Sequence, residues 1–385
     1  MLTISNPTTE QDSGLSSPTE TAQASMLLGP QNIEIREFPI PEIREDEILI
    51  KVEGCGICGT DVHEYKRDPF GLIPVVLGHE GTGTIVRKGS GVKEDFTGAP
   101  LNVGDQIVTS VMIPDDDTFV KTFPAKQNLS DGMGVYGLLP DTEDYHLNGY
   151  FATHMVVRGG ATVFKVNGMS VKQRVLIEPM AVTNHALNRI KTTNLLDFSS
   201  TVLVQGCGPI GLMMIATLMA AGVRNIIAVD GVQMRLDMAK KMGATRTLNI
   251  SESSLEERLA QVQEWTGSHK GADFAVQCTG VAAAAADVWK YVRRGGGLCE
   301  LGFFMDNGTC PINPHEDLCK KEITAVGSWV YTPEEYPEAI GLIQQCERIG
   351  IPIEELVTQT YPLSEINQAM QDNIAMKGIK LAILP

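Results

Sequence analysis

The chain has 385 residues, of which 43% are hydrophobic and 20% charged, a composition typical of a globular protein with two domains and large cores. Its 31 basic and 47 acidic residues give a formal net charge of −16, without a basic cluster that could neutralise nucleic-acid phosphates or bind an anionic membrane. We therefore expect neither a nucleic acid nor a membrane as a partner.

The N-terminal residues and the cysteines indicate where the protein works. Residues 1–24 are rich in Ser, Thr, Pro and Gln, so we expect a flexible tail, with ordered sequence from about Met26. The first basic residue is Arg36, which is too late for a secretory signal, and the longest nearly apolar run, 209–223, is too short to cross a bilayer. The eight cysteines are then expected to be thiols or metal ligands, and the expected location is the reducing cytoplasm.

The first third of the chain predicts an irregular β domain or barrel. Short apolar or alternating segments are separated by Gly and Pro turns, and the expected strands are residues 33–38, 47–52, 75–77, 83–86 and 105–111.

From residue 201 the pattern changes to an alternation of strand and helix. The expected strands are 201–205, 225–230, 246–250, 272–277 and 298–301, and the expected helices between them are 209–221, 232–242, 255–265 and 282–293. This alternation predicts an α/β fold with a doubly wound parallel sheet. A strand at 323–326 and a helix at 333–346 follow.

A glycine motif opens the first helix of the α/β part. The segment Gly206-Cys207-Gly208-Pro209-Ile210-Gly211 has the form GxGxxG between an expected strand and helix, and Asp230 ends the next strand about 20 residues later. Gly206 would allow the tight turn, Gly208 the approach of a pyrophosphate, and Gly211 close helix–strand packing. The alternative is that the glycines merely mark a turn.

The acidic residue after the motif indicates which dinucleotide binds. Asp230 would accept hydrogen bonds from ribose hydroxyls and repel a phosphate, which predicts NAD rather than NADP, although Arg235 could tolerate a phosphate. Other strand ends supply weaker candidates for cofactor contact, which could equally be ordinary turns: Gly280, Leu301, Gly302 and Phe303.

Three short segments carry candidate metal ligands. Cys58, His79 and a carboxylate from Glu80 or Glu178 would supply the three ligands of a catalytic zinc and leave one position open. Taken singly, each has a simpler interpretation: a buried thiol, a core or surface imidazole, and for Glu178 a helix start before Pro179. Cys55 forms a CxxC with Cys58, but no second CxxC exists, so we interpret Cys55 as structural.

Taken together, these motifs resemble one known family. GICGTDVH (56–63), LGHEGTG (77–83), IEPMAV (177–182) and VLVQGCGPIGL (202–212) have the order and spacing of the zinc-dependent medium-chain dehydrogenases, and the resemblance runs from about Met26 to the C-terminus. It implies a GroES-like irregular β catalytic domain at 25–180, a Rossmann NAD-binding domain at 181–319, and a segment at 320–385 that returns to the catalytic domain.

The resemblance also implies roles for individual residues. Cys58 and His79 would bind one catalytic zinc, and Glu80 would be a permanent or exchangeable ligand. Glu178 stands where the alcohol-dehydrogenase branch has a second Cys, and resembles the polyol and butanediol branches, where a Glu binds the metal directly or through water. Thr60 and His63 match a proton relay, and Asp61 would orient a ligand. Residues 112–148 contain no Cys for a structural zinc, so one zinc per chain is expected.

The implied reaction is reversible oxidation of a secondary alcohol or diol, with zinc as Lewis acid, NAD as hydride acceptor, and proton loss through Thr60, a ribose hydroxyl and His63. Val330 stands where sorbitol-type relatives carry an Arg, which disfavours a sugar polyol, although a polyol or a cyclic or terpenoid alcohol stays an alternative. Less favoured are a zinc-free reductase and a non-catalytic nucleotide-binding protein.

Three further features of the resemblance stay open. Relatives are commonly dimers or tetramers, so a homodimer or homotetramer is expected. The acidic residues 112–148 could contribute to oligomer contacts or to pocket closure. Tyr65 and Trp329 could line the pocket or belong to the core, and we favour the core for Trp329.

Overall fold

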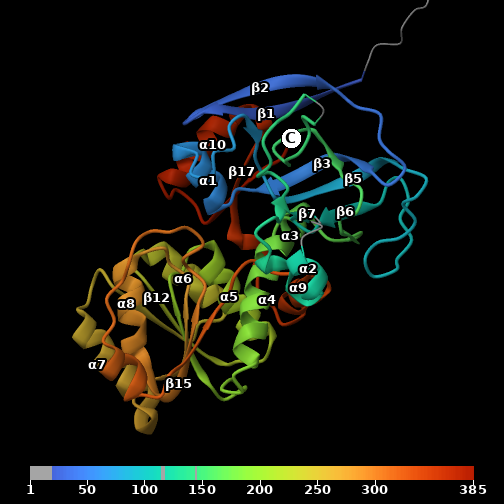
Figure 1. The fold of residues 1–385 in the computed structure, drawn as a ribbon. Helices are drawn as coiled ribbons and strands as arrows, with labels where there is room; N and C mark the ends of the chain where they lie inside the picture. Colours follow the sequence, from blue (N-terminus) through green and yellow to red (C-terminus); the bar gives the residue numbers. More distant parts are fainter. Residues whose placement is uncertain (1–19, 114–117, 144) are drawn as a thin grey trace, which may run out of the picture.

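In the computed structural model, which describes residues 20–113, 118–143 and 145–385, a β-rich body and an α/β body lie next to each other (Figure 1). Helices α4 (Ile177–Lys191) and α9 (Glu335–Arg348) pack against each other between the two bodies. No helix among these residues is both long and apolar enough to cross a membrane.

The β-rich body is built on a seven-stranded sheet that combines strands from residues 48–165 with two strands from the C-terminal segment. Six strands follow the order β10-β6-β5-β3-β18-β17, and β9 also pairs with β3. Their bounds are β3 (Ile48–Gly56), β5 (Glu80–Lys88), β6 (Gln106–Thr109), β9 (His154–Val157), β10 (Val163–Lys165), β17 (Val357–Tyr361) and β18 (Lys380–Ile383). Because β18 pairs antiparallel with β3, the C-terminal segment lies beside the strand that leads to Cys58.

Smaller elements complete this body. A second sheet has the order β2-β1-β4, and β7 pairs with β8. The bounds are β1 (Thr21–Gly29), β2 (Asn32–Pro39), β4 (Val75–Val76), β7 (Met112–Ile113), β8 (Gly134–Val135), α1 (Gly59–Arg67), α2 (Thr118–Thr122), η1 (Pro124–Leu129), α3 (Val171–Arg174), η4 (Ile353–Leu356), η5 (Leu363–Glu365) and α10 (Ile366–Ile374).

The prediction of a flexible tail at residues 1–24 was wrong for residues 21–24. Residues 21–24 belong to β1, in which Ala22 and Ala24 are buried and alternate with exposed Thr21 and Gln23. Alanine contributes little to an apolar pattern, so pairing with β2 and β4, rather than local hydrophobicity, orders this strand. Residues 1–19 of the predicted tail lie outside the described residues.

The α/β body contains a parallel six-stranded sheet in the order β13-β12-β11-β14-β15-β16, as the strand–helix alternation predicts. Helices α4, α5 and α6 cover one face and α7 and α8 the other (Figure 1). The bounds are β11 (Thr201–Gln205), β12 (Asn225–Asp230), β13 (Arg246–Asn249), β14 (Ala272–Gln277), β15 (Val292–Glu300), β16 (Thr324–Gly327), α5 (Pro209–Ala220), α6 (Gln233–Met242), α7 (Leu255–Thr266), η2 (Gly267–His269), α8 (Ala282–Tyr291) and η3 (Pro314–Cys319).

Side-chain alternation on these strands separates two cores. Along β11, Val202 and Val204 join the core that includes α4 and α5, whereas Leu203 joins the core beneath α7 and α8. The carboxyl ends of β11, β12, β14, β15 and β16 meet at one edge of the sheet, where a ligand crevice forms in such folds.

Candidate active site

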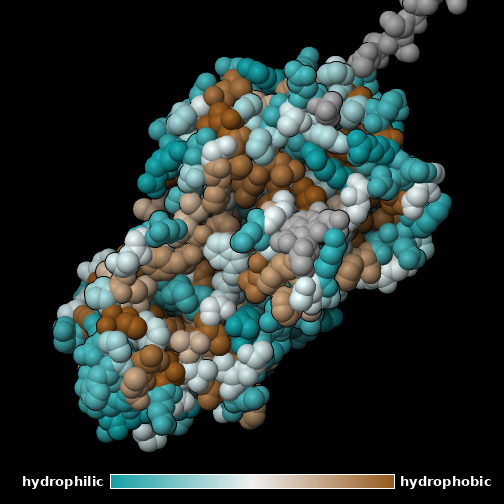
Figure 2. Space-filling model, in the orientation of Figure 1, coloured by the Kyte–Doolittle hydropathy of each residue, from teal (hydrophilic) through white to brown (hydrophobic). Residues whose placement is uncertain are grey.

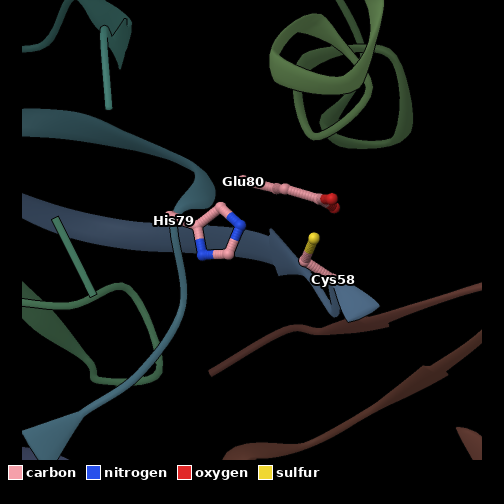
Figure 3. A group of neighbouring side chains, drawn as sticks. All are labelled: Cys58, His79 and Glu80. Carbon is pink, nitrogen blue, oxygen red and sulfur yellow. The ribbon is translucent and has the colours of Figure 1, made fainter. Parts of the chain in front are cut away.

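Three residues, one at the start of helix α1 and two at the start of strand β5, form a compact group of metal-binding donors. One ligand atom from each of Cys58, His79 and Glu80 lies within 4.8 Å of the other two. Figure 3 shows the Cys58 sulfur and the Glu80 carboxylate directed into the same space beside the His79 ring. Cys58 precedes α1, His79 precedes β5, and Glu80 begins β5, so the pairing of β3 with β5 brings the two segments together.

Asp61 connects the backbone of both ligand segments. Its Oδ2 accepts a hydrogen bond from the backbone N–H of Cys58 at 2.8 Å, and its Oδ1 accepts one from the N–H of Gly78 at 3.1 Å. Oδ1 also lies 3.5 Å from Nδ1 of His79. Asp61 is completely buried, so it fixes both ligands without access to water.

The Glu80 carboxylate forms an ion pair with a buried lysine. Nζ of Lys380 lies 2.6 Å from each carboxylate oxygen of Glu80, and both side chains are almost completely buried. Burial alone would lower the pKa of Lys380, but the Glu80 carboxylate raises it, so the ammonium stays charged. A Cβ at Gly56 would come within 2.1 Å of Glu80 Oε2, so only glycine allows this carboxylate its position.

Glu178 lies next to this group and has a different partner. It stands in the first turn of α4, and its Oε1 accepts a hydrogen bond from the Tyr331 hydroxyl at 2.6 Å. Burial and the neighbouring Glu80 carboxylate raise the pKa of Glu178 to about 7, an effect that His79 opposes. Glu178 is therefore close to the donors, while the compact group itself consists of Cys58, His79 and Glu80 among the described residues. Its role as a ligand stays a prediction.

Thr60 and His63 lie on α1 directly after the first ligand. Thr60 Oγ1 is 3.7 Å from the sulfur of Cys58, and His63 is one helical turn further on, on the same face as Thr60. His63 is half-buried, and burial together with Arg67 and Lys66 lowers its pKa from 6.5. A neutral imidazole here can accept a proton near pH 7.

Cys55 differs from Cys58 in its surroundings. It lies within β3, is completely buried, and donates its thiol hydrogen to the Gly56 carbonyl at 3.3 Å. Burial raises the pKa of Cys55 well above its usual range, which disfavours the thiolate that a metal requires. These contacts support the structural interpretation of Cys55.

The glycine motif has the geometry of a phosphate-binding turn. Gly206 has φ +92°, and a Cβ there would meet Thr279 at 2.4 Å. Gly208 precedes α5, which begins at Pro209 and continues with Ile210, and a Cβ on Gly208 would meet nothing within 4 Å. At Gly211 a Cβ would lie 1.7 Å from the Gly206 carbonyl oxygen. The helix thus packs tightly on the turn, while its amino end stays open to an anion.

Asp230 lies beside this turn at the end of β12. Its Oδ2 accepts a hydrogen bond from the N–H of Cys207 at 2.7 Å, and its Oδ1 accepts one from Val232 at 2.8 Å. The carboxylate therefore also holds the glycine turn in place. Arg235 is half-buried in α6, and its charge acts on Cys207 within the turn.

The weaker cofactor candidates meet at the same edge of the sheet. Gly280 follows β14, while Leu301, Gly302 and Phe303 follow β15, and the Leu301 N–H donates to the Gln277 carbonyl at 3.0 Å. A Cβ at Gly302 would lie 2.1 Å from the Thr279 carbonyl oxygen. The two strand ends are in contact, as expected for residues that border one crevice.

Comparison with known proteins identifies the chain. Residues 44–168 match the alcohol dehydrogenase GroES-like domain, and residues 209–345 match the zinc-binding dehydrogenase domain. Sorbitol dehydrogenase from Bacillus subtilis (strain 168) is 31% identical over 376 residues, which cover 95% of this chain and 98% of that protein. The chain belongs to the zinc-dependent medium-chain dehydrogenases. It is a zinc- and nicotinamide-dependent oxidoreductase of alcohols.

Two other similar proteins carry names that refer to different alcohols or to alcohols in general. A 5-exo-hydroxycamphor dehydrogenase from Pseudomonas putida is 27% identical over 361 residues, covering 91% of this chain and 95% of that protein. The crystal structure of an alcohol dehydrogenase from Thermotoga maritima has a TM-score of 0.88 at 28% identity, covering 95% of this chain and all of that one. The family resemblance stated from the motifs is confirmed, as is the combination of GroES-like and Rossmann folds.

The residues present fit both groups that the family uses. A thiol, an imidazole and a carboxylate form a donor set suited to zinc, and the open amino end of α5 suits a pyrophosphate. Cys58, His79 and Glu80 would hold the ion, with Glu178 adjacent, and the glycine turn with Asp230 would hold the dinucleotide.

Sequence reasoning missed two partners of the site carboxylates, Lys380 and Tyr331. Lys380 stands in the apolar run that forms β18, and a lysine in such a strand requires a buried acidic partner, which is a signal that was available. Tyr331 had no comparable signal, because its hydroxyl reaches Glu178 only through the tertiary fold.

Proposed function

We propose that this dehydrogenase oxidises a secondary alcohol or diol reversibly to the carbonyl compound and prefers NAD. The main support for this proposal is that the sulfur, nitrogen and oxygen donors of Cys58, His79 and Glu80 lie within 4.8 Å of one another. The carbinol carbon loses a hydride, the hydroxyl loses a proton, and a C=O bond results. The site must therefore bind the oxygen, orient the carbon and remove one proton.

When bound, zinc supplies Lewis-acid polarisation of the hydroxyl oxygen, and the oxidised nicotinamide ring accepts the hydride. Cys58 and His79 would hold the ion, and Asp61 fixes the position of both. Glu80, whose charge Lys380 partly balances, would be the third ligand, and Glu178 is a second carboxylate that Tyr331 orients. The two carboxylates have separate anchors, Lys380 for Glu80 and Tyr331 for Glu178.

Proton removal is assigned to residues of α1. Thr60 lies beside the Cys58 sulfur and can accept the hydroxyl proton in a hydrogen bond. His63 is half-buried on the same helical face and has a lowered pKa, so at pH 7 it can take up the proton and release it to water.

The preference for NAD rests on the Asp230 carboxylate. It lies beside the glycine turn, and its oxygens keep lone pairs for ribose hydroxyls after they accept from Cys207 and Val232. The phosphate on the ribose of NADP would be repelled by this negative charge. The Arg235 guanidinium on α6 would have to offset the repulsion.

We further propose a homodimer, with a homotetramer as the alternative, that forms through the edge strand β16. This strand ends the sheet order, and Thr324, Ala325 and Gly327 are exposed along it. A mostly apolar groove of about 320 Å³ lies alongside and includes Trp289, Ile312 and Val326 in its lining. Pairing with the β16 of a second copy would cover both edge and groove. Light scattering should then show at least two chains, and Ala325→Lys should give monomers.

All eight cysteines are free thiols, which supports the cytoplasm as the site of action. The decisive experiment measures NADH formation by zinc-loaded protein with diols, polyols and cyclic alcohols, using a chelated sample as the control. Chelator-sensitive turnover supports the proposal. A protein that binds no zinc and forms no NADH from any alcohol would favour a zinc-free reductase acting on an activated double bond. Binding of zinc and NAD without turnover on any alcohol would favour a non-catalytic nucleotide-binding protein.

A further inference from the structure

Two exposed aromatic side chains stack on each other at the carboxyl edge of the parallel sheet. The ring centroids of Phe304 and Trp329 are 4.9 Å apart, with an interplanar angle of 17°. Phe304 is 39% exposed and Trp329 44% exposed, so the predicted core position of Trp329 was wrong. Phe304 follows β15 and Trp329 follows β16, and the ends of these neighbouring strands border the crevice.

A short stretch of chain connects this aromatic pair to the metal-binding group. Trp329 is followed by Val330 and then by Tyr331, whose hydroxyl bonds to Glu178 beside Glu80. Two residues of chain span at most about 7 Å, so the backbone of Trp329 lies near that of Tyr331. The aromatic pair is thereby placed two residues along the chain from the tyrosine that bonds to Glu178. Figure 2 shows hydrophobic surface in the hollow between the two bodies.

The backbone of this stretch is held in an unusual conformation. Val330 has φ +50°, and for a β-branched residue this left-handed region is unfavourable. The carbonyl oxygen of Trp329 accepts a hydrogen bond at 2.7 Å from Nδ2 of Asn128, which is buried in η1. Asn128 belongs to residues 112–148, which the sequence suggested could contribute to pocket closure. This region therefore helps to fix the backbone of Trp329.

The chemistry of this surface selects the type of alcohol. Aromatic faces gain free energy when they cover hydrocarbon, and large aromatic groups left exposed together mark a binding surface. Val330 offers no side-chain hydrogen bond, so a hydroxyl-rich chain buried against Val330 and Phe304 would leave hydroxyls unpaired.

We propose that Phe304 and Trp329 form an apolar wall beside the alcohol site, and that the substrate is a secondary alcohol carrying a hydrocarbon ring next to the reacting carbon. This proposal rests on the proposed function and narrows it. The occupant of the wall is the ring, and the hydroxyl points to Cys58, His79 and Glu80.

The kinetic test compares cyclohexanol and borneol with 2,3-butanediol, xylitol and sorbitol, using zinc-loaded enzyme and NAD. We expect kcat/KM to be at least about tenfold higher for the cyclic alcohols. Trp329→Ala and Phe304→Ala should raise KM for cyclohexanol about tenfold with a smaller change in kcat, whereas Trp329→Phe should restore most of the binding. Phe198→Ala is the matched control, because Phe198 is 76% exposed and precedes the amino end of β11.

A second readout does not depend on turnover. Cyclohexanol cannot react with NADH, so calorimetric titration of the zinc–NADH protein with cyclohexanol measures binding alone. We expect Trp329→Ala to weaken this binding about tenfold and Phe198→Ala to leave it unchanged. A preference for polyols, or unchanged cyclohexanol binding in both wall variants, would overturn the wall. Failure of the proposed function differs from this, because it would abolish turnover of every alcohol while calorimetry still reports on the wall.

Discussion

The Tyr331 hydroxyl donates a 2.6 Å hydrogen bond to the Glu178 carboxylate across 153 residues of sequence. Tyr331 is completely buried, and its hydroxyl also lies 3.3 Å from that of Tyr336, whose ring stacks on Phe164. Glu178 is thus anchored by a residue of the C-terminal segment, while its own helix, α4, lies between the two bodies.

Removal of this anchor should change the metal site. Tyr331→Phe deletes a hydrogen bond to a carboxylate and should cost about 1.5–3 kcal/mol of stability and about tenfold in kcat/KM. With Glu178 free to approach the ion, the visible spectrum of the cobalt-substituted protein should shift. Tyr361→Phe is the control, because its hydroxyl donates to Asp372 at 2.8 Å in α10. An unchanged cobalt spectrum in Tyr331→Phe would show that this hydroxyl does not control Glu178.

Lys380→Met should leave Glu80 as an unpaired buried charge. Breaking such a pair costs about 3–5 kcal/mol, measured as thermal or denaturant unfolding of the metal-free protein. Zinc should then stabilise the variant more than the parent, because the ion replaces the lost positive charge. Lys241→Met is the matched control: Lys241 pairs with Glu355 at 2.6 Å, but both are about half exposed, so about 1 kcal/mol or less is expected. Equal losses in the two variants would contradict the importance of burial here.

Cys58→Ala should remove the metal and leave the cofactor site intact. Zinc content should fall from about one per chain to almost none, and kcat/KM should fall by more than the roughly 10–100-fold that loss of an outer partner costs. NADH affinity, measured by fluorescence, should stay within about twofold of the parent. Cys55→Ala is the control and should keep its zinc. Full activity in Cys58→Ala would mean that the ligands are wrongly assigned.

The acid side of the pH–rate profile should report His63. Burial, Arg67 and Lys66 lower its pKa from 6.5, so the neutral, proton-accepting form persists below that pH, and the rate should fall only as pH drops through the lowered value. The stability of the fold depends on pH in the same direction. The contribution of neutral His63 to the free energy of unfolding is present above about pH 6.5 and is lost as pH falls through its folded-state pKa.

Removal of a nearby charge tests this assignment of the acid limb. Arg67→Ala should move the limb of kcat to higher pH, whereas Arg36→Ala, a change on strand β2, should not. His63→Asn should lower kcat about tenfold or more and abolish the limb. A limb unaffected by His63→Asn would assign it to another group.

Asp230→Ala should weaken NADH binding about tenfold and reduce the discrimination against NADPH, since the carboxylate that repels a ribose phosphate is gone. Asp230→Asn keeps a hydrogen-bond acceptor for the Cys207 N–H and removes only the charge, so it separates support of the turn from repulsion. Fluorescence titration with both reduced cofactors gives the two affinities. Unchanged discrimination in both variants would show that another residue recognises the ribose.

Where local pattern and tertiary environment agree, the predicted elements match the structure. Strands 201–205, 225–230 and 272–277 have the predicted bounds, because each is a buried apolar run in a parallel sheet. By contrast, β15 begins at Val292, six residues before the predicted strand, and its first part includes Arg293, Arg294 and three glycines. That part pairs with β14 only at Val292 and again from Gly297, and no apolar pattern marks it.

The sequence by itself determined the family, the parallel sheet, the glycine turn and the short ligand motifs, because each depends on residues close together in the chain or on repeated local patterns. Only the tertiary structure showed that the donor atoms of Cys58, His79 and Glu80 lie within 4.8 Å of one another, and that Lys380 and Tyr331, far away in sequence, hold the carboxylates of Glu80 and Glu178. It also placed Trp329 at the surface against Phe304, because burial depends on how the ends of β15 and β16 meet.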